Sequence, residues 1–306
     1  MRIKRMLAAV AACGFALMVQ AQTTTKTNDF VSFDRIEVAS DFEVTYHVSD
    51  TYKVNWTFDT ILSDLVSVFV TGKTLYIDFN RKGMSSELKK TYRGRNAPKM
   101  VLRVAVYAPF FQELSLQDNA TFEGGGNRFE TNVFSVSVTG KSKVSNLIVG
   151  ANEVSVEATK DGNVSMTAEA GEVSLKTDNK AVVNLIQDSD KLTVNAAGSS
   201  SVILTGSTLD MVTNVQNSTK VQMTGSAETL RHSGKGSAEV DLISVPLKTA
   251  EVTMTGGKLN VNASDLLKVD LKSGADVYFS GDPKIEVVNI SSATLMHYTG
   301  SNSRRR

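Results

Sequence analysis

Apolar positions recur at a fixed spacing over roughly residues 134–279 of the chain. Equivalent starts fall at Phe134, Val154, Val173, Leu192, Met211, Leu230, Thr249 and Leu267, so the successive steps are 20, 19, 19, 19, 19, 19 and 18. Ten positions after each start stands an aliphatic residue, in turn Val144, Val164, Val183, Val202, Val221, Val240, Leu259 and Val277. Self-similarity at a fixed period, here about 19 residues, indicates stacked repeats, so we expect a fold built from equivalent coils of about that length.

Within each repeat, apolar residues alternate with other residues twice, at positions 0 and 2 and again at positions 10 and 12. Position 12 is apolar in seven of the eight repeats, the exception being Asn146. Such alternation is typical of half-buried β-strands. Each repeat therefore contains two predicted strands, and the fold class is all-β.

The residues between the two strands indicate tight corners. Position 8 is small in every repeat, in turn Ser142, Gly162, Ala181, Ser200, Thr219, Ala238, Gly257 and Ala275. Position 6 is Gly or Asn in five of the eight repeats, in turn Gly140, Lys160, Asn179, Gly198, Asn217, Gly236, Thr255 and Ser273. Gly and Asn tolerate the positive φ of a tight bend. The pattern predicts a parallel β-helix, and the leucine-rich alternative is excluded because no repeat carries its leucine spacing.

The region before the regular coils, residues 30–108, does not follow the 19-residue repeat. Five segments read as strands, namely 33–46, 52–58, 66–70, 75–79 and 100–106. Residues 59–65 read as a short helix capped by Asp59, and residues 85–92 are compatible with another. We expect a single elongated β-helix domain over residues 22–300, with irregular coils at 30–108 and regular coils at 109–300. Residues 301–306 form a polar tail that could blunt the C-terminal end.

Residues 80–99 form a basic insertion with seven cations and one acid, Glu87. Clustered cations in a loop are candidate contacts for an anionic ligand, and the candidates are Arg81, Lys82, Lys89, Lys90, Arg93 and Arg95. The alternative is a solvated insertion that binds nothing, which is the commoner role of a charged loop. The sequence alone favours that plainer interpretation.

The N-terminus predicts export. Three cations in residues 1–5 precede an almost wholly apolar stretch at residues 6–19, and Ala21 closes a small-residue cleavage site. Residues 1–21 therefore read as a signal peptide that is too short for a comfortable membrane span. A competing interpretation is lipidation at Cys13, the only cysteine, within a lipobox-like context. We expect a periplasmic, surface or secreted protein with no transmembrane segment in the mature chain.

The charge balance narrows the partners. Cleavage after Ala21 removes three of 33 cations and none of 32 acids, which leaves a formal charge of −2. A near-neutral, slightly acidic chain is a poor generic nucleic-acid binder. Rows of Ser, Thr and Asn on an exposed β face suit a glycan or a cell-surface protein as partner. The polar, cationic C-terminal residues disfavour stacking, so we expect weak or no self-association.

Several short motifs resemble the bacterial putative auto-transporter adhesin, head GIN domain family. They are residues 33–38 (FDRIEV), 108–109 (AP), 198–202 (GSSSV), 273–277 (SGADV) and 279–283 (FSGDP). The resemblance covers roughly residues 30–300. It implies a right-handed parallel β-helix that is secreted or exposed on the envelope, as is common in gut Bacteroidetes. It implies no catalytic residues, because the family has none established.

The sequence contains few candidates for catalytic, phosphate-binding or metal-binding residues. Residues 138–142 end like a phosphate-binding loop, but Ser135 stands where that motif needs its first glycine, and no helix is expected to follow. The histidines, His47, His232 and His297, lack metal-ligand spacing, so no cofactor or metal is expected. Asp188, Asp190 and Asp210 are the acids that a polysaccharide-degrading β-helix enzyme would need close together. They form no recurrent acidic pair.

These observations favour a non-catalytic, adhesin-like or ligand-binding module that acts outside the cytoplasm. The alternatives are a self-assembling structural solenoid and a polysaccharide-degrading enzyme. A separate candidate is Thr60, since Asp59-Thr60-Ile61 resembles an O-glycosylation acceptor of exported Bacteroidetes proteins. The simpler interpretation of this tripeptide is the helix cap at Asp59.

Overall fold

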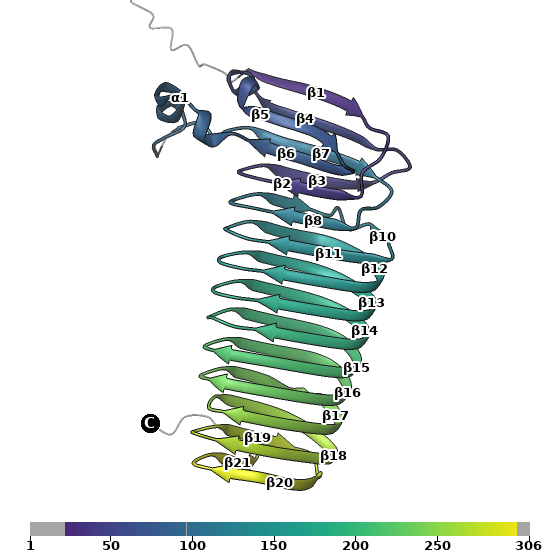
Figure 1. Ribbon diagram of the computed structural model, residues 1–306, viewed down its shortest axis with the longest axis vertical. Coiled ribbons are helices and arrows are strands. Elements are labelled where there is room, and N and C mark those ends of the chain that lie inside the picture. The colour runs from purple at the N-terminus through teal and green to yellow at the C-terminus, as the bar shows by residue number, and fades with distance from the viewer. Residues whose placement is uncertain (1–21, 96, 299–306) are drawn as a thin grey trace, which may run out of the picture.

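In the computed structural model, which describes residues 22–95 and 97–298, the chain forms an elongated β-solenoid of about ten turns (Figure 1). Each long strand wraps around the rod and pairs in parallel with the strand of the next coil. These strands are β12 (Lys143–Ala158), β13 (Asn163–Thr177), β14 (Val182–Ala196), β15 (Ser201–Asn217), β16 (Lys220–Gly236), β17 (Glu239–Thr255) and β18 (Lys258–Lys272). The predicted parallel β-helix is confirmed, and so is its period of about 19 residues.

The predicted interior ladder is also confirmed. The eight aliphatic residues at position 10, from Val144 to Val277, are all between 0 and 2% exposed. Neighbours in the ladder face one another directly, as in the pairing of Val183 with Val202. Fully burying a valine-sized side chain stabilises a fold by about 1.5–3 kcal/mol. This one row therefore contributes much of the cohesion between coils.

Two positions depart from the predicted register, and each departure has a local cause. Asn146 is exposed with a φ of 50° because β12 holds an extra residue between Val144 and Leu147, and Leu147 takes the inward place. That extra residue accounts for the longer first step of the repeat. Thr249, a predicted repeat start, is only half-buried; Ala250 occupies the ladder position, after a register shift in β17.

The corners behave as predicted at seven of the eight repeats. Positive φ angles occur at Gly140, Lys160, Asn179, Gly198, Asn217, Gly236 and Ser273. Thr255 is the exception, because Gly256 adopts the positive φ of 83° in its place. Backbone N–H groups at the corners donate to carbonyls one coil away, as from Ser199 to Asn179. The corners are therefore joined along the rod by hydrogen bonds as well as by side-chain packing.

Shorter strands complete the coils at both ends of the regular stack. On the N-terminal side these are β8 (Glu113–Leu116), β9 (Thr121–Glu123), β10 (Arg128–Glu130) and β11 (Val133–Val138). On the C-terminal side they are β19 (Asp276–Ser280), β20 (Lys284–Ser291) and β21 (Thr294–His297). β18 pairs with β19 along its first half and with β20 along its second, and β21 pairs with β19.

The N-terminal end departs from the parallel pattern. Its strands are β1 (Thr23–Asp29), β2 (Arg35–Val38), β3 (Glu43–Val48), β4 (Lys53–Asp59), β5 (Val66–Thr71), β6 (Thr74–Phe79) and β7 (Leu102–Ala108). β2 and β3 continue the parallel stack, whereas β4 runs antiparallel to both β1 and β7, and β5 runs antiparallel to β6. The 3₁₀ helix η1 (Thr60–Leu65) follows β4 and buries Leu62 completely.

Two local predictions for this end need correction. The strand predicted over residues 33–46 is interrupted at Ser40, whose φ is 68°, so it becomes β2 and β3. The helix predicted over residues 59–65 is a 3₁₀ helix, and the Asp59 side chain does not cap it. The helix compatible with residues 85–92 is present as α1 (Ser86–Thr91), and the 3₁₀ turn η2 (Arg81–Gly83) precedes it.

Some sequence predictions concern residues that the structure does not describe. Cys13, the cleavage site after Ala21 and the polar tail at residues 301–306 all lie outside the described ranges. Among residues 22–95 and 97–298, no helix has both the length and the apolar character needed to cross a membrane.

Candidate cationic groove

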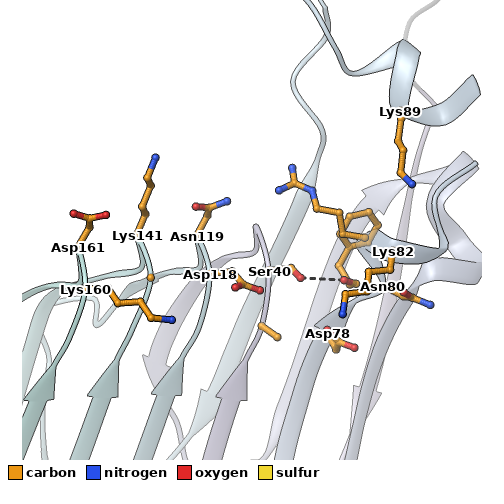
Figure 2. A pocket seen from close by; sticks show the side chains of 14 residues that line it. Ser40, Asp78, Asn80, Lys82, Lys89, Asp118, Asn119, Lys141, Lys160 and Asp161 are labelled. Carbon is orange, nitrogen blue, oxygen red and sulfur yellow. Dashed lines mark hydrogen bonds between the residues drawn. The ribbon is translucent and has the colours of Figure 1, made fainter. Parts of the chain in front are cut away.

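A groove of about 840 Å³ lies where the basic insertion approaches the corners of neighbouring coils (Figure 2). One side consists of the insertion with the end of β6, and the other consists of coil corners. The lining residues are Ala39, Ser40, Asp78, Phe79, Asn80, Arg81, Lys82, Lys89, Asp118, Asn119, Gly140, Lys141, Lys160 and Asp161. We refer to this site as the cationic groove.

The insertion is held in place by local capping and by packing. The Asn80 side chain accepts a hydrogen bond from the Gly83 N–H at 3.0 Å, which closes the turn η2. The Ser85 hydroxyl accepts from the Leu88 N–H at 3.2 Å and caps α1, as serine commonly does at a helix start. Met84 is buried, and Leu88 packs against the core of the rod. The lysines of the insertion are thereby presented from an ordered segment.

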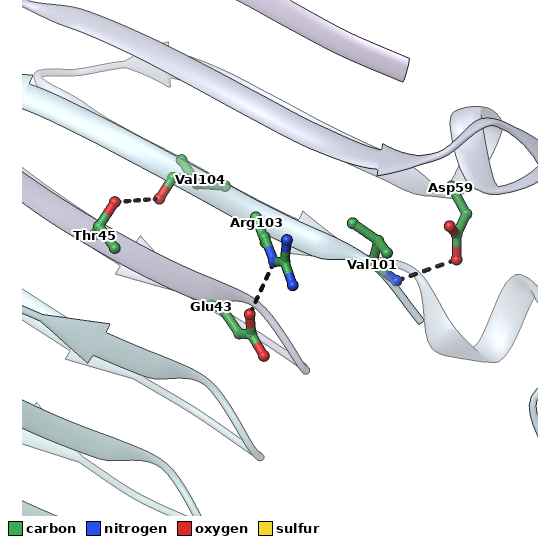
Figure 3. Close-up of polar contacts among 6 residues, drawn as sticks. All are labelled: Glu43, Thr45, Asp59, Val101, Arg103 and Val104. Carbon is green, nitrogen blue, oxygen red and sulfur yellow. Dashed lines mark hydrogen bonds and ion pairs between the residues drawn. The ribbon is translucent and has the colours of Figure 1, made fainter. Parts of the chain in front are cut away.

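A buried carboxylate fastens the far end of the insertion. The Tyr92 hydroxyl donates to Asp59 Oδ2 at 2.7 Å, and the Val101 N–H donates to the same oxygen at 3.1 Å. Figure 3 shows Asp59 reaching Val101, while Arg103 pairs with Glu43 on β3. Burial, and then the neighbouring Asp59 carboxylate, raise the pKa of the Tyr92 phenol above its ordinary value. Tyr92 therefore stays a hydrogen-bond donor across the physiological pH range.

The opposite wall is built by three consecutive corners. Asp118, Gly140 and Lys160 each have a positive φ, and the Lys141 and Asp161 N–H groups donate to the carbonyls of Asp118 and Gly140. This repeated geometry aims equivalent side chains in the same direction. Figure 2 shows the side chains of Asn119, Lys141 and Asp161 standing side by side on successive corners.

The charges in the groove are predominantly positive. Its lining contains five cations and three carboxylates, a formal excess of two positive charges. Arg81 forms an ion pair with Asp41 at 3.1 Å, and Asp41 also accepts a hydrogen bond from the Asn119 amide at 2.7 Å.

The other four cations of the groove are Lys82, Lys89, Lys141 and Lys160. None of them has a carboxylate within 4.0 Å in the described part of the chain. Many lysines further along the rod are paired with an acid, as in Lys176–Glu157, Lys191–Glu172, Lys220–Glu239, Lys248–Glu228 and Lys268–Glu251. The groove therefore gathers four lysines that form no ion pair in the described part of the chain, although Asp78, Asp118 and Asp161 also line it.

The six cations predicted as ligand contacts are divided by the structure. Arg81, Lys82 and Lys89 line the groove, whereas Lys90, Arg93 and Arg95 are exposed and are not among its lining residues. Two further lining lysines, Lys141 and Lys160, were not predicted from the sequence. The sequence holds a signal for them, because Lys141 and Lys160 occupy neighbouring corner positions, 7 and 6, of two consecutive repeats.

The predicted acceptor Thr60 lies at the N-terminal end, away from the lining of the groove. Its hydroxyl is 2.8 Å from the Thr24 hydroxyl, and its side chain is half-buried. The neighbouring Asp59 carboxylate is buried and engaged by Tyr92 and Val101. These contacts replace the helix cap that was the simpler interpretation of Asp59.

The remaining candidate residues take structural roles. Asp188 accepts a hydrogen bond from Ser207 at 2.7 Å, and Asp210 accepts one from Thr229 at 2.6 Å, each across one coil. His232 is buried with its Nδ1 2.7 Å from the Thr213 hydroxyl, and burial lowers its pKa to about 4. Among the described residues, no three His, Cys, Asp or Glu side chains gather as a metal site would require.

The chain matches a known protein family. The family model described as "Putative auto-transporter adhesin, head GIN domain" matches residues 32–187 and 171–283, which is most of the chain. The chain belongs to this family. The resemblance inferred from the short sequence motifs is thereby confirmed. Membership in an adhesin family implies an extracellular or surface location.

Solved structures share the fold of this family member. A putative adhesin from Parabacteroides merdae ATCC 43184 is 16% identical with a TM-score of 0.52, and the match covers 92% of this chain and 98% of that chain. A putative adhesin from Parabacteroides distasonis ATCC 8503 is 17% identical with a TM-score of 0.51, covering 91% and 98%. None of the curated proteins matches the chain. At these identities the likeness concerns the fold alone.

Proposed function

We propose that the protein is a non-catalytic, extracytoplasmic binding module whose cationic groove holds a segment of an anionic glycan. The observation that carries this proposal is the set of four lysines without carboxylate partners, gathered in one groove of about 840 Å³. Membership in an adhesin family supports a role in binding surface molecules. The ligand class is inferred from the charge and shape of the groove.

The groove suits a linear polymer better than a compact ligand. It lies between the insertion and a row of corners, so its floor follows the axis of the rod for several coils. Successive coils stand about 4.8 Å apart, and a polymer with regularly spaced acidic groups can meet Lys141 and Lys160 on two successive corners and the insertion lysines opposite them. Individual exposed ion pairs are weak, about 0.2–1 kcal/mol each, so recognition depends on several acting together.

The surroundings favour a glycan over a lipid headgroup. A protein that docks on a membrane normally places apolar side chains beside its basic residues so that they enter the acyl boundary. The lining of this groove is polar except for Ala39 and Phe79, and Phe79 is buried. Leu88, the apolar residue of α1, packs against the rod instead of pointing outward.

A polysaccharide-degrading activity is the less supported alternative. Hydrolysis of a glycosidic bond needs a pair of carboxylates that flank it, about 5–9 Å apart. The acids considered for this role, Asp188 and Asp210, are each engaged by a hydroxyl of the next coil. Asp78, Asp118 and Asp161 also line the cationic groove, where they reduce its net positive charge.

The test compares two triple variants that remove the same charge from the same end of the molecule. The groove variant is Lys89→Ser with Lys141→Ser and Lys160→Ser, and the control is Lys90→Ser with Arg93→Ser and Arg95→Ser. Binding to immobilised alginate, polygalacturonate and a sulfated glycosaminoglycan is measured by interferometry at several salt concentrations. With three ion pairs of about 0.2–1 kcal/mol each, the groove variant should bind roughly threefold to a hundredfold more weakly.

The control variant should retain most of the wild-type affinity, and raising the salt should weaken wild-type binding by screening the charges. Equal losses in the two triple variants would show that the overall charge of this end matters and the groove does not. Binding only to vesicles of anionic phospholipid would replace the glycan with a lipid. Release of new reducing ends from any of the polymers would overturn the non-catalytic assignment.

A further inference from the structure

The last coil of the rod exposes its core. In the described part of the chain β20 pairs only with β18, so its other edge is unpaired. Ile285, Val287 and Ile290 continue the inward ladder of β18, yet they are 40, 54 and 39% exposed. Their partners one coil earlier, Leu267, Val269 and Leu271, are all 0% exposed. An unpaired edge beside an open apolar layer is a template for another strand.

The order of inward and outward residues along β20 is the same in both directions. Three residues at each end alternate outward, inward, outward, as shown by their pairing with Leu266–Lys268 and with Asp270–Lys272. Between them lie Val287 and Val288, where Val288 is the extra residue of a register shift and is 63% exposed. This symmetry follows from the bulge, because an unbroken strand of the same length would read differently from its two ends.

We propose that two copies of the chain pair through β20, antiparallel, about a two-fold axis between Val287 and Val288. In this register Ile285 lies opposite Ile290 of the second copy, and both face the core. Glu286 lies opposite Asn289, and Lys284 lies opposite Ser291, so no like charges oppose one another. Self-complementary pairing of this kind is what a two-fold interface requires.

A second copy fits this end better than residues 299–306 do. Residues 299–306 lie outside the described ranges, and their sequence, TGSNSRRR, contains no apolar side chain to complete the open layer. The identical end of another molecule supplies an apolar layer of matching composition. The proposal departs from the expectation of weak or no self-association drawn from the sequence.

The opposite end of the rod does not offer the same opportunity. There β1 runs antiparallel to β4 and carries mostly exposed polar residues, and η1 closes the core with Leu62. Head-to-tail stacking into a filament is therefore disfavoured, and association stops at two copies. The two cationic grooves would lie toward the far ends of the dimer, because the groove is lined by residues no further along the rod than Asp161, whereas the interface is formed by β20.

The test uses the full chain, exported through its own N-terminal segment, in sedimentation velocity over a wide range of protein concentration. Wild type should sediment as a dimer, and Val288→Lys should be monomeric because two lysines then flank the axis. Ile186→Lys is the matched control, since Ile186 is 56% exposed on β14 in the middle of the rod. It should remain dimeric.

Two variants of opposite charge test the interface even if Val288→Lys alone perturbs the fold. Val288→Lys and Val288→Glu should each be monomeric, and an equimolar mixture should form a mixed dimer that native mass spectrometry identifies. Removal of residues 299–306 should leave the wild-type dimer intact. A wild-type monomer, a dimer that survives Val288→Lys, or dimerisation that appears only after removal of the tail would each overturn the proposal.

Discussion

The two ends of this rod differ in how the open strand edge and the apolar layer of the terminal coil are covered. Every coil of a solenoid leaves one strand edge and one apolar layer uncovered, so the last coil at either end needs a cover. At the N-terminal end the chain abandons the repeat, reverses strand direction in β4 and closes the core with Leu62. At the C-terminal end the repeat simply stops, and Val287 remains 54% exposed. Within one copy of the chain, the periodic core is closed only at the end where the chain departs from the repeat.

The interiors beneath the two ends also differ. Five aromatic rings pack together near the N-terminal end with centroid distances from 4.9 to 6.3 Å, namely Tyr46, Phe111, Phe122, Phe129 and Phe134. The Tyr46 hydroxyl donates to the Ala108 carbonyl at 2.9 Å, and burial raises the pKa of that phenol. Further along, the core narrows to aliphatic residues such as Val183 and Val202. The wide, aromatic end is the one that carries the insertion and the cationic groove.

The largest difference between the ends should appear when one core residue is truncated at each. Leu62→Ala should lower the free energy of unfolding by about 2–5 kcal/mol, as expected for a fully buried leucine. In the monomer, at protein concentrations too low for the proposed dimer, Ile285→Ala should cost much less, because Ile285 is 40% exposed in a single copy. Urea denaturation followed by circular dichroism measures both. Similar losses for the two variants would mean that the C-terminal end is covered as well as the N-terminal end.

Lowering the pH should destabilise the C-terminal half of the fold before the N-terminal end. Thr213 and His232 form a buried polar pair in an otherwise aliphatic ladder, and their neighbours in it are Val194 and Val252. Burial lowers the pKa of His232 to about 4 from an ordinary value of 6.5.

The direction of this change in stability depends on whether the folded or the unfolded chain binds the proton more tightly. Below pH 6.5 the unfolded chain protonates this histidine while the folded chain does not, so its contribution to stability is present above pH 6.5. That contribution falls as the pH drops toward 4, by about 3 kcal/mol in total at 1.36 kcal/mol per pH unit. Hydrogen exchange at pH 5 should show protection falling first in β15–β17. The double variant Thr213→Val with His232→Val should lose this component, which separates it from the titration of surface carboxylates.

The periodic part of the molecule could be predicted closely from the sequence. The inward ladder and the corners follow from a spacing that each coil repeats, so many equivalent positions support every assignment. The two errors in register, at Asn146 and Thr249, occur where a strand holds an extra residue. A bulge changes the facing of a side chain without changing the composition of the segment, so the pattern alone could not locate it.

The antiparallel N-terminal end and half of the groove could not be predicted in this way. The strands β1, β4 and β7 have no repeat to align, and β4 pairs with segments distant in the sequence, β1 on one side and β7 on the other. Lys141 and Lys160 stand on the corners of successive coils and meet only because those coils stack. Aligning the repeats places these two lysines in neighbouring columns, at positions 7 and 6 of two consecutive corners, so an alignment of corner positions would bring them close together from the sequence alone.

The smallest expected loss of stability comes from breaking the hydrogen bond between Tyr92 and Asp59, which holds the insertion to the N-terminal end. Tyr92→Phe removes one of the two hydrogen bonds that Asp59 Oδ2 accepts, while Asp59 stays buried at 1% exposure. A hydrogen bond to a charged group contributes about 1.5–3 kcal/mol, so the variant should lose about that much and should be cleaved faster by protease within residues 80–99. Tyr107→Phe is the matched control, since the Tyr107 ring stacks on His47 at 4.9 Å and its hydroxyl has no partner in the described part of the chain. If both variants were cleaved at the wild-type rate, the insertion would be held by Met84 and Leu88 packing, and Asp59 would serve only β7.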